Sequence, residues 1–192
     1  MCIRDRHLAL IMRNIILLSL FLFSISACEW EGSTTSYNNG FARTLTEDQV
    51  IDKTLNDFIS DPKTQDETDR NIILNYIIDN KLEMQSTPEG IYYQIIKEGT
   101  GDYPSIKNEI VVNYHGTFLN GKVFDTTKGK SPFTYPLNRT IDGWQKGIPL
   151  MKTGSKAMFI IPSSLCYGEN GWGEKIKPNT ILQFEIELLG VK

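Results

Sequence analysis

The sequence has 192 residues, of which 22% are charged and 40% are hydrophobic, and its formal net charge is −3. This composition is typical of globular proteins, and the length suffices for one core with an appendage. Lysine and arginine form no basic cluster, so we expect no nucleic-acid partner.

The first feature along the chain is an export signal. Arg13 precedes an apolar run over residues 15–24, which is too short to cross a hydrocarbon layer about 30 Å thick. We therefore predict a signal peptide over residues 1–27 rather than a transmembrane helix. Met12 makes a better start than Met1, because the longer version places Arg13 inside the hydrophobic stretch.

The residues around Cys28 resemble a bacterial lipobox, since small side chains precede the cysteine. This resemblance implies that Cys28 is lipidated and becomes the mature N-terminus. It would anchor the chain in the bacterial cell envelope, facing the periplasm or the cell surface. An ordinary signal peptide cut nearby is the alternative. Cys166 is then the remaining thiol, so we expect no disulfide framework, and nothing in the sequence pairs it with a histidine as a nucleophile.

A flexible tether is predicted over residues 28–45, which are rich in Ser, Thr, Asn and Gly. An appendage of two helices follows, over residues 46–86. A capping box at Thr46 begins the first helix, over 47–60, and an apolar stripe predicts the second over 69–84.

The sequence leaves three arrangements open for these helices. They pack on each other, dock on the main domain, or pair with a second copy, which would make a homodimer through residues 46–84.

From residue 87 to residue 192, the predicted main domain, the period of the apolar residues becomes two. Such alternation predicts strands with one buried and one wet face. The predicted strands cover 91–96, 111–118, 158–161 and 182–188, with one short helix over 144–151. This pattern predicts an α+β fold, in which a twisted antiparallel sheet wraps around one short helix and a ligand binds in the concavity between them.

Four short motifs in the main domain carry the chemistry. They are Val123-Phe124-Asp125, Gly143-Trp144, Tyr167-Gly168 and Ile176-Lys177-Pro178-Asn179-Thr180. Aromatic side chains around a single carboxylate suit an apolar slot that grips a proline ring. In this order the motifs resemble the FKBP-type peptidyl-prolyl cis-trans isomerases, over roughly residues 90–192.

The resemblance implies an FKBP-like domain that isomerises proline-containing polypeptides without a cofactor or a metal. The implied catalytic residues are Asp125, Tyr167, Trp144 and Phe124. The implied substrate-binding residues are Tyr114, Phe133, Thr140, Ile141, Ile176 and Phe184. By the same resemblance Trp144 forms the floor under the proline ring, while the Tyr167 hydroxyl and the Ile141 N–H donate to substrate carbonyls.

Rotation about an X–Pro bond needs no nucleophile. Amide resonance sets a barrier of about 18 to 20 kcal/mol. Because the planar amide is more dipolar than the twisted one, a dry apolar slot destabilises the ground state more than the transition state. The sequence therefore favours a catalyst that assists the folding of exported proteins. A non-enzymatic chaperone or assembly partner, which uses the same pocket or the N-terminal helices to bind, is the alternative.

Taken singly, each motif has a simpler interpretation. Tyr114, Phe133 and Phe184 lie on alternating strands and fit a plain core. Asp125 before two threonines fits an Asx-type turn, and Trp144 fits a helix cap. The ordered set, rather than any one residue, favours a binding site.

Three positions depart from the family pattern. They are Thr140, Trp172 and Lys175, and we expect all three on the lip of the slot rather than its floor. The expected consequence is an altered substrate preference or weaker macrolide binding.

Overall fold

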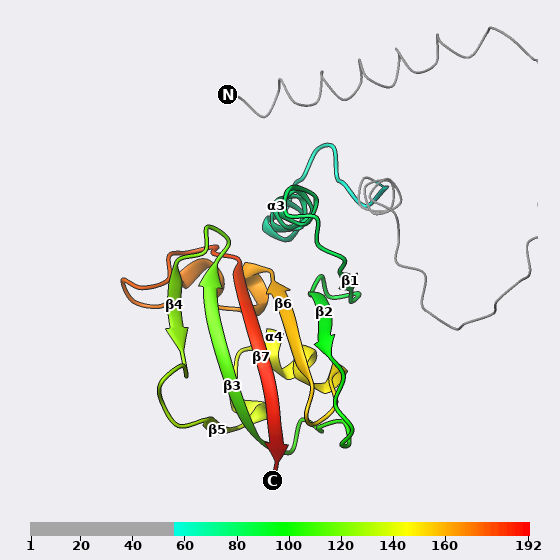
Figure 1. Ribbon diagram of the computed structural model, residues 1–192. Coiled ribbons are helices and arrows are strands. Elements are labelled where there is room, and N and C mark those ends of the chain that lie inside the picture. The colour runs from blue at the N-terminus through cyan, green and yellow to red at the C-terminus, as the bar shows by residue number, and fades with distance from the viewer. Residues whose placement is uncertain (1–55) are drawn as a thin grey trace, which may run out of the picture. The chain divides into compact units, whose positions relative to one another are not determined.

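Within residues 56–192, which the computed structural model describes, seven strands form one antiparallel sheet around a short helix (Figure 1). The strands are β1 (Gln85–Ser86), β2 (Tyr92–Lys97), β3 (Glu109–Phe118), β4 (Val123–Thr126), β5 (Phe133–Pro136), β6 (Lys156–Ile161) and β7 (Leu182–Val191). Their order is β1-β2-β6-β7-β3-β4, with β5 also paired to β3. The short helix is α4, Asp142–Gly147. The predicted α+β fold is confirmed.

Several predictions fall on residues outside the described range. These are the signal peptide over 1–27, the lipidation of Cys28, the tether over 28–45 and the capping box at Thr46. Most of the first predicted helix, 47–60, also lies outside it, and residues 58–60 are not helical. No helix among residues 56–192 is long and apolar enough to cross a membrane.

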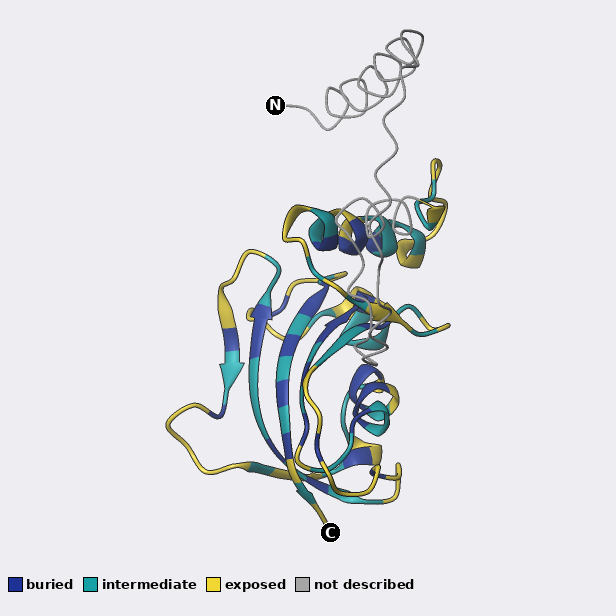
Figure 2. Ribbon diagram, turned by 45° about the vertical axis from the view of Figure 1, so that its right-hand side comes forward, coloured by how far each residue is buried: buried dark blue, intermediate teal, exposed yellow. Residues whose placement is uncertain are grey.

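The strand register gathers apolar side chains on one face of the sheet. Tyr114 of β3 lies opposite Ile186 of β7, and Phe184 of β7 lies opposite Phe159 of β6. Along β7 the buried residues alternate strictly with half-buried ones from Leu182 to Leu188, as the period of two predicts. Figure 2 shows the same alternation as dark and light bands along the central strands.

Helix α4 packs on this face because two of its residues are glycines. A Cβ added at Gly143 would lie 2.4 Å from Cγ2 of Ile161, and one at Gly147 would lie 3.1 Å from the Phe159 ring. The helix backbone therefore approaches β6 more closely than side chains would allow. The close approach buries Trp144 and Ile148 in the main core.

Pro149 explains why the predicted helix over 144–151 is shorter than expected. The α-helical part ends at Gly147 and continues as one 3₁₀ turn, η2 (Ile148–Leu150), with the proline in its first positions. Proline lacks the N–H that an α-helical continuation needs.

A longer helix, α3 (Gln65–Asp79), docks on the other face of the sheet. Its residues Ile73, Leu74 and Ile77 are buried against Tyr92 and Ile160. Ile160 follows Phe159, so its side chain points away from the α4 side. Of the three predicted arrangements, α3 therefore docks on the main domain.

The limits of α3 differ from the predicted 69–84. Thr64 and Glu67 form a capping box, which starts the helix four residues earlier. The helix ends in a Schellman motif, in which the Leu82 N–H donates to Ile77 O at 3.0 Å and Lys81 has a φ of 54°. Leu82 still packs on the α3 cluster although it lies beyond the helix, which explains why the apolar stripe extended too far.

Candidate active site

Five aromatic rings from five elements form one cluster, with Trp144 of α4 at its centre. Tyr114 on β3, Phe133 on β5 and Phe184 on β7 present T-shaped contacts to the indole at 5.2, 6.3 and 5.4 Å between ring centroids. Phe124 on β4 meets Phe184 at 5.5 Å. Trp144 is only 5% exposed, whereas Tyr114 and Phe133 are half-buried. The aromatic cluster thus has a closed centre and a partly open rim.

A β-bulge brings Phe124 and Asp125 to this cluster together. On β3 the register moves one residue from Gly116 to Thr117, while on β4 it moves two residues, from Asp125 to Val123. Phe124 is therefore the extra residue of β4. A bulge re-aims side chains in this way and is common next to binding sites.

Two residues that were not predicted as site residues, Gly116 and Thr127, position the cluster. A Cβ at Gly116 would lie 2.7 Å from Cζ of Phe124, so the glycine makes room for that ring. The buried Thr127 hydroxyl accepts from the Tyr114 N–H at 2.9 Å and holds the chain after β4 against β3. A glycine inside an apolar strand pattern is a sequence signal for such a close approach. No comparable signal in the sequence indicates the role of Thr127.

Asp125 has both carboxylate oxygens engaged. Oδ2 accepts from the Tyr114 hydroxyl at 2.6 Å, and Oδ1 accepts from the Thr126 N–H at 2.9 Å. The second bond is a local turn contact, while the first joins the carboxylate to the aromatic cluster. Burial and the bond to Asp125 raise the pKa of the Tyr114 hydroxyl, so it remains a donor at neutral pH.

Tyr167 lies between two 3₁₀ turns, η3 (Ser163–Leu165) and η4 (Gly168–Asn170). Burial raises the pKa of its hydroxyl, and the neighbouring Cys166 and Asp125 raise it further. Tyr167 packs against the core cluster that contains Trp144, Phe124 and Phe184. Among residues 56–192 its hydroxyl has no hydrogen-bond partner.

Two more donors at the cluster lack acceptors among the described residues. The Trp144 Nε1–H is buried without a partner. The backbone N–H of Ile141, which precedes α4, also finds no acceptor there. Since most buried or partly buried polar groups are paired, these N–H groups and the Tyr167 hydroxyl suit a ligand that carries carbonyl oxygens.

The remaining predicted binding residues differ in how they face the cluster. Ile176 is 1% exposed and belongs to the core that contains Trp144, and Ile141 packs against that core. Thr140, in contrast, donates its hydroxyl to Leu137 O at 2.7 Å. That hydroxyl stabilises the turn η1 (Leu137–Arg139) instead of pointing a free donor at a ligand.

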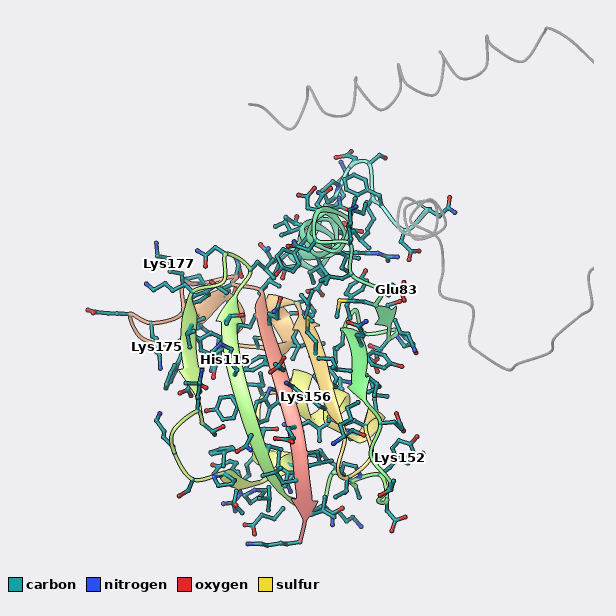
Figure 3. The ribbon with its side chains drawn as sticks, in the orientation of Figure 1. Glu83, His115, Lys152, Lys156, Lys175 and Lys177 are labelled. Atoms are coloured by element: carbon teal, nitrogen blue, oxygen red, sulfur yellow. The ribbon has the colours of Figure 1, made fainter. Side chains whose placement is uncertain are left out.

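Trp172 and Lys175 lie on the loop beside Tyr167. The Trp172 ring is 50% exposed and stacks on Tyr167 at 5.8 Å, with 17° between the ring planes. The Lys175 ammonium lies 5.3 Å from the Trp172 ring centre; Figure 3 labels this lysine. Paired backbone bonds between Trp172 and Ile176 hold the loop. Both residues therefore extend the surface next to Tyr167.

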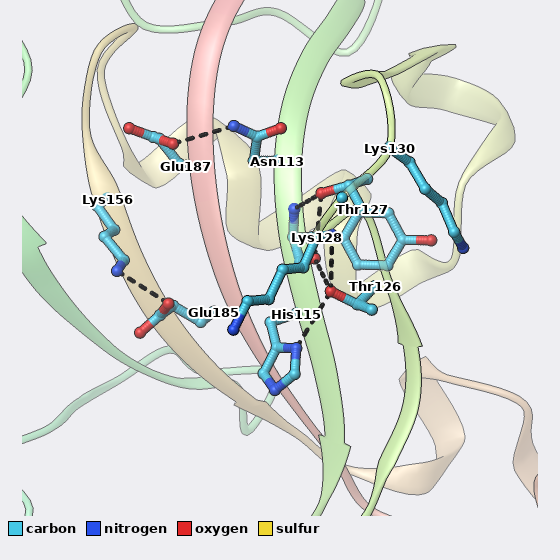
Figure 4. A pocket seen from close by; sticks show the side chains of 11 residues that line it. Asn113, His115, Thr126, Thr127, Lys128, Lys130, Lys156, Glu185 and Glu187 are labelled. Atoms are coloured by element: carbon cyan, nitrogen blue, oxygen red, sulfur yellow. Dashed lines mark hydrogen bonds and ion pairs between the residues drawn. The ribbon is translucent and has the colours of Figure 1, made fainter.

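A cavity of about 510 Å³ lies on the face of the sheet opposite the aromatic cluster (Figure 4). Four of its polar side chains form two pairs: Lys156 binds Glu185 at 2.9 Å, and Asn113 donates to Glu187 at 3.2 Å. His115 and Lys128 also line it. Such a polar, internally paired surface is unsuited to a proline ring, so the aromatic cluster is the better candidate.

Cys166 is the only cysteine among residues 56–192, and it is not in a disulfide. Burial raises the pKa of the Cys166 thiol, with the charge of Asp69 adding to the shift, so the thiol stays protonated. Among residues 56–192, no three His, Cys, Asp or Glu side chains are grouped to hold a metal ion.

Comparison with known proteins agrees with the site. Residues 101–189 match the family model described as FKBP-type peptidyl-prolyl cis-trans isomerase. The chain is 40% identical over 109 residues to the probable FKBP-type peptidyl-prolyl cis-trans isomerase FkpA of Neisseria meningitidis serogroup B, covering 56% of this chain and 40% of that protein. It is 43% identical over 110 residues to FkpA of Aeromonas hydrophila, covering 57% and 41%. The chain thus spans about two fifths of the length of these curated relatives.

Solved structures give the same result. A peptidyl-prolyl cis-trans isomerase from Pseudomonas syringae is 31% identical with a TM-score of 0.58, and the match covers 70% of this chain and 99% of that one. FkpA from Escherichia coli is 32% identical with a TM-score of 0.59, covering 73% of this chain and 63% of that one.

Proposed function

The chain belongs to the FKBP-type peptidyl-prolyl cis-trans isomerase family, and we propose that it catalyses rotation about X–Pro bonds in extended polypeptides. The observation that carries this proposal is the set of unpaired donors around the aromatic cluster. The Tyr167 hydroxyl and the Ile141 N–H both lack acceptors among residues 56–192, beside a nearly buried indole.

The proposed mechanism is the removal of water from the proline amide. The proline ring lies against Trp144, with Tyr114 and Phe133 at its sides, and the flanking carbonyls accept from Tyr167 and Ile141. An apolar surface stabilises the less dipolar twisted amide relative to the planar one. No covalent step is needed, because the barrier comes from amide resonance alone.

Asp125 is proposed to act by position and charge. Its Oδ2 accepts from Tyr114 and its Oδ1 from Thr126, so the carboxylate is held without rotating freely. A negative charge fixed beside the cluster favours the partial positive charge on the amide N–H of the residue that follows the proline.

A proline-tetrapeptide isomerisation assay tests the proposal directly. We expect the wild-type chain to accelerate the cis–trans exchange, and the Trp144→Leu variant to lose most of that acceleration. Binding of the peptide without any acceleration of the exchange would instead support the chaperone or assembly-partner alternative.

We further propose an envelope location for this activity, with the chain lipidated at Cys28 and acting on exported proteins. Slow X–Pro isomerisation, on the scale of tens of seconds, limits the folding of many such proteins. Metabolic labelling with a fatty acid tests the anchor: wild type should carry label in the membrane fraction, and Cys28→Ala should carry none.

Macrolide binding and a dimer through residues 46–84 are proposals of the same kind. The exposed Trp172 ring beside Tyr167 supports weaker macrolide binding, because it occupies the lip that a large ring would cross. Calorimetry measures the affinity for a macrolide. The mass of the full chain in solution shows whether it forms a dimer.

A further inference from the structure

Helix α3 carries a buried carboxylate that the proposed mechanism does not use. Asp69 is 1% exposed, although aspartate is rarely buried fully unless it is paired. It lies one turn before the apolar residues Ile73, Leu74 and Ile77, which dock the helix on the sheet. Figure 1 shows α3 next to the ends of the central strands.

Both oxygens of this carboxylate are hydrogen-bonded. Oδ1 accepts from the Gln65 amide at 2.7 Å, one turn earlier on the same helix. Oδ2 accepts from the backbone N–H of Ser163 at 2.7 Å, across 94 residues of sequence. The second bond is buried and charge-assisted, and such bonds are among the stronger ones in proteins.

Ser163 begins the short turn that leads to Tyr167. Its N–H is the first of η3, and no other side chain caps that turn. Within the turn, the Cys166 N–H donates to Ser163 O at 3.0 Å, and Tyr167 follows directly. The position of Ser163 therefore influences the position of the Tyr167 ring.

Docking alone does not require a carboxylate here. A buried charge loses its hydration, and an apolar residue of similar size often docks an element equally well or better. What the carboxylate adds is direction, because it accepts from one specific N–H. The apolar face of α3 packs the helix on the sheet, and Asp69 fixes the position of the Ser163 N–H relative to the helix.

We propose that Asp69 is a positioning residue for the isomerase reaction, which holds the Ser163–Tyr167 segment so that the Tyr167 hydroxyl faces the substrate carbonyl. This inference rests on the proposed function, and it makes α3 part of the working site. The raised pKa of Cys166, to which the charge of Asp69 contributes, is consistent with this closeness.

A double-mutant cycle on the full chain tests the proposal. Asp69→Ala should lower kcat/KM several-fold, and by no more than Tyr167→Phe does, because it acts by displacing that hydroxyl. In the Tyr167→Phe background the same substitution should cost less than about twofold, because the hydroxyl it aligns is absent. Asp69→Asn keeps an acceptor oxygen and should restore activity to within about twofold of wild type.

Asn71 provides the matched control on the same helix. Its side chain donates to Ile59 O at 2.7 Å and accepts from the Ile59 N–H at 3.0 Å, so it ties α3 to the preceding segment and not to η3. Asn71→Ala should lower the melting temperature and leave kcat/KM unchanged. An equal loss of kcat/KM from Asp69→Ala with and without the Tyr167 hydroxyl would overturn the proposal.

Hydrogen exchange gives a second readout that does not depend on activity. The Ser163 amide should exchange slowly in wild type and faster in Asp69→Ala, together with the amides of Cys166 and Tyr167. If the Ser163 amide exchanges as fast in wild type as in the variant, the hydrogen bond from Ser163 to Asp69 does not hold this segment, and the proposal is wrong. If wild type has a protected Ser163 amide but no isomerase activity, the proposed function is wrong, while the hydrogen bond between Ser163 and Asp69 is still supported.

Discussion

The Tyr114 hydroxyl and the Asp125 carboxylate lie 2.6 Å apart across the β3–β4 pair. Asp125 is opposite Gly116 in the register, two residues along from Tyr114, so the two side chains are diagonal neighbours on one face. The bulge at Phe124 keeps both Phe124 and Asp125 at the aromatic cluster. This hydrogen bond therefore joins the carboxylate, and with it the bulge, to Tyr114. The Tyr114 ring in turn contacts the indole of Trp144, with 5.2 Å between the ring centroids.

Removing that carboxylate should impair catalysis more than folding. In Asp125→Ala the Tyr114 hydroxyl loses its acceptor and the fixed charge disappears, so we expect kcat/KM to fall about tenfold. Asp125→Asn, which keeps an acceptor for Tyr114, separates the two effects. If the asparagine variant matches wild type, the charge has no catalytic part and only the hydrogen bond matters.

The Tyr167 hydroxyl is the second target. Tyr167→Phe should retain the fold, because the hydroxyl has no partner among residues 56–192. A neutral hydrogen bond contributes about 0.5 to 1.5 kcal/mol, so kcat/KM should fall between about twofold and tenfold while the melting temperature stays constant. Unchanged kinetics would show that no substrate carbonyl reaches this group.

Alkaline pH should destabilise the fold through its tyrosines. Burial raises the pKa values of Tyr114 and Tyr167 above their ordinary value of 10.0. For a group whose folded pKa is raised, the stabilisation is fully present below the unfolded pKa and is lost as pH rises toward the folded one. Stability from these groups should therefore be level at pH 7 to 9 and fall above about pH 10. Denaturant unfolding at several pH values measures this, and the fall should be smaller in Tyr167→Phe.

Gly143 should tolerate no side chain. In Gly143→Ala the new Cβ would lie 2.4 Å from Ile161 Cγ2, which forces α4 away from β6 and costs about 1 to 3 kcal/mol. Gly190→Ala is the control, since a Cβ at Gly190 meets nothing within 4 Å. Thermal unfolding compares the two, and equal melting temperatures would contradict the close packing of α4.

Sequence periodicity predicted the four longer strands, β2, β3, β6 and β7, but gave no bounds for the short strands β1, β4 and β5. From Leu182 to Leu188, apolar and polar residues alternate in the sequence, and buried and half-buried residues alternate in the structure. The short helix α4 contains Gly143 and Trp144 and overlaps the predicted helix. The helix limits were less predictable. The Schellman end of α3 uses Lys81 with a positive φ, where a glycine would have marked the stop.

The site was predictable as a set of residues and not as a geometry. Trp144 and its aromatic neighbours came from the ordered motifs, and the structure brings their rings together. The bulge at Phe124 leaves no pattern in a single strand, because it depends on the register with β3. Asp69 was equally hidden: its partner is a backbone N–H 94 residues away, and no local spacing indicates such a bond.

Exchange spectroscopy on a proline tetrapeptide, with catalytic amounts of wild type, Asp125→Ala and Trp144→Leu, measures directly whether the aromatic cluster catalyses the rotation. We expect fast cis–trans exchange with wild type and a marked loss in both variants, with all three folded by circular dichroism. Exchange that is equal with all three proteins, or no faster than without protein, would contradict this expectation.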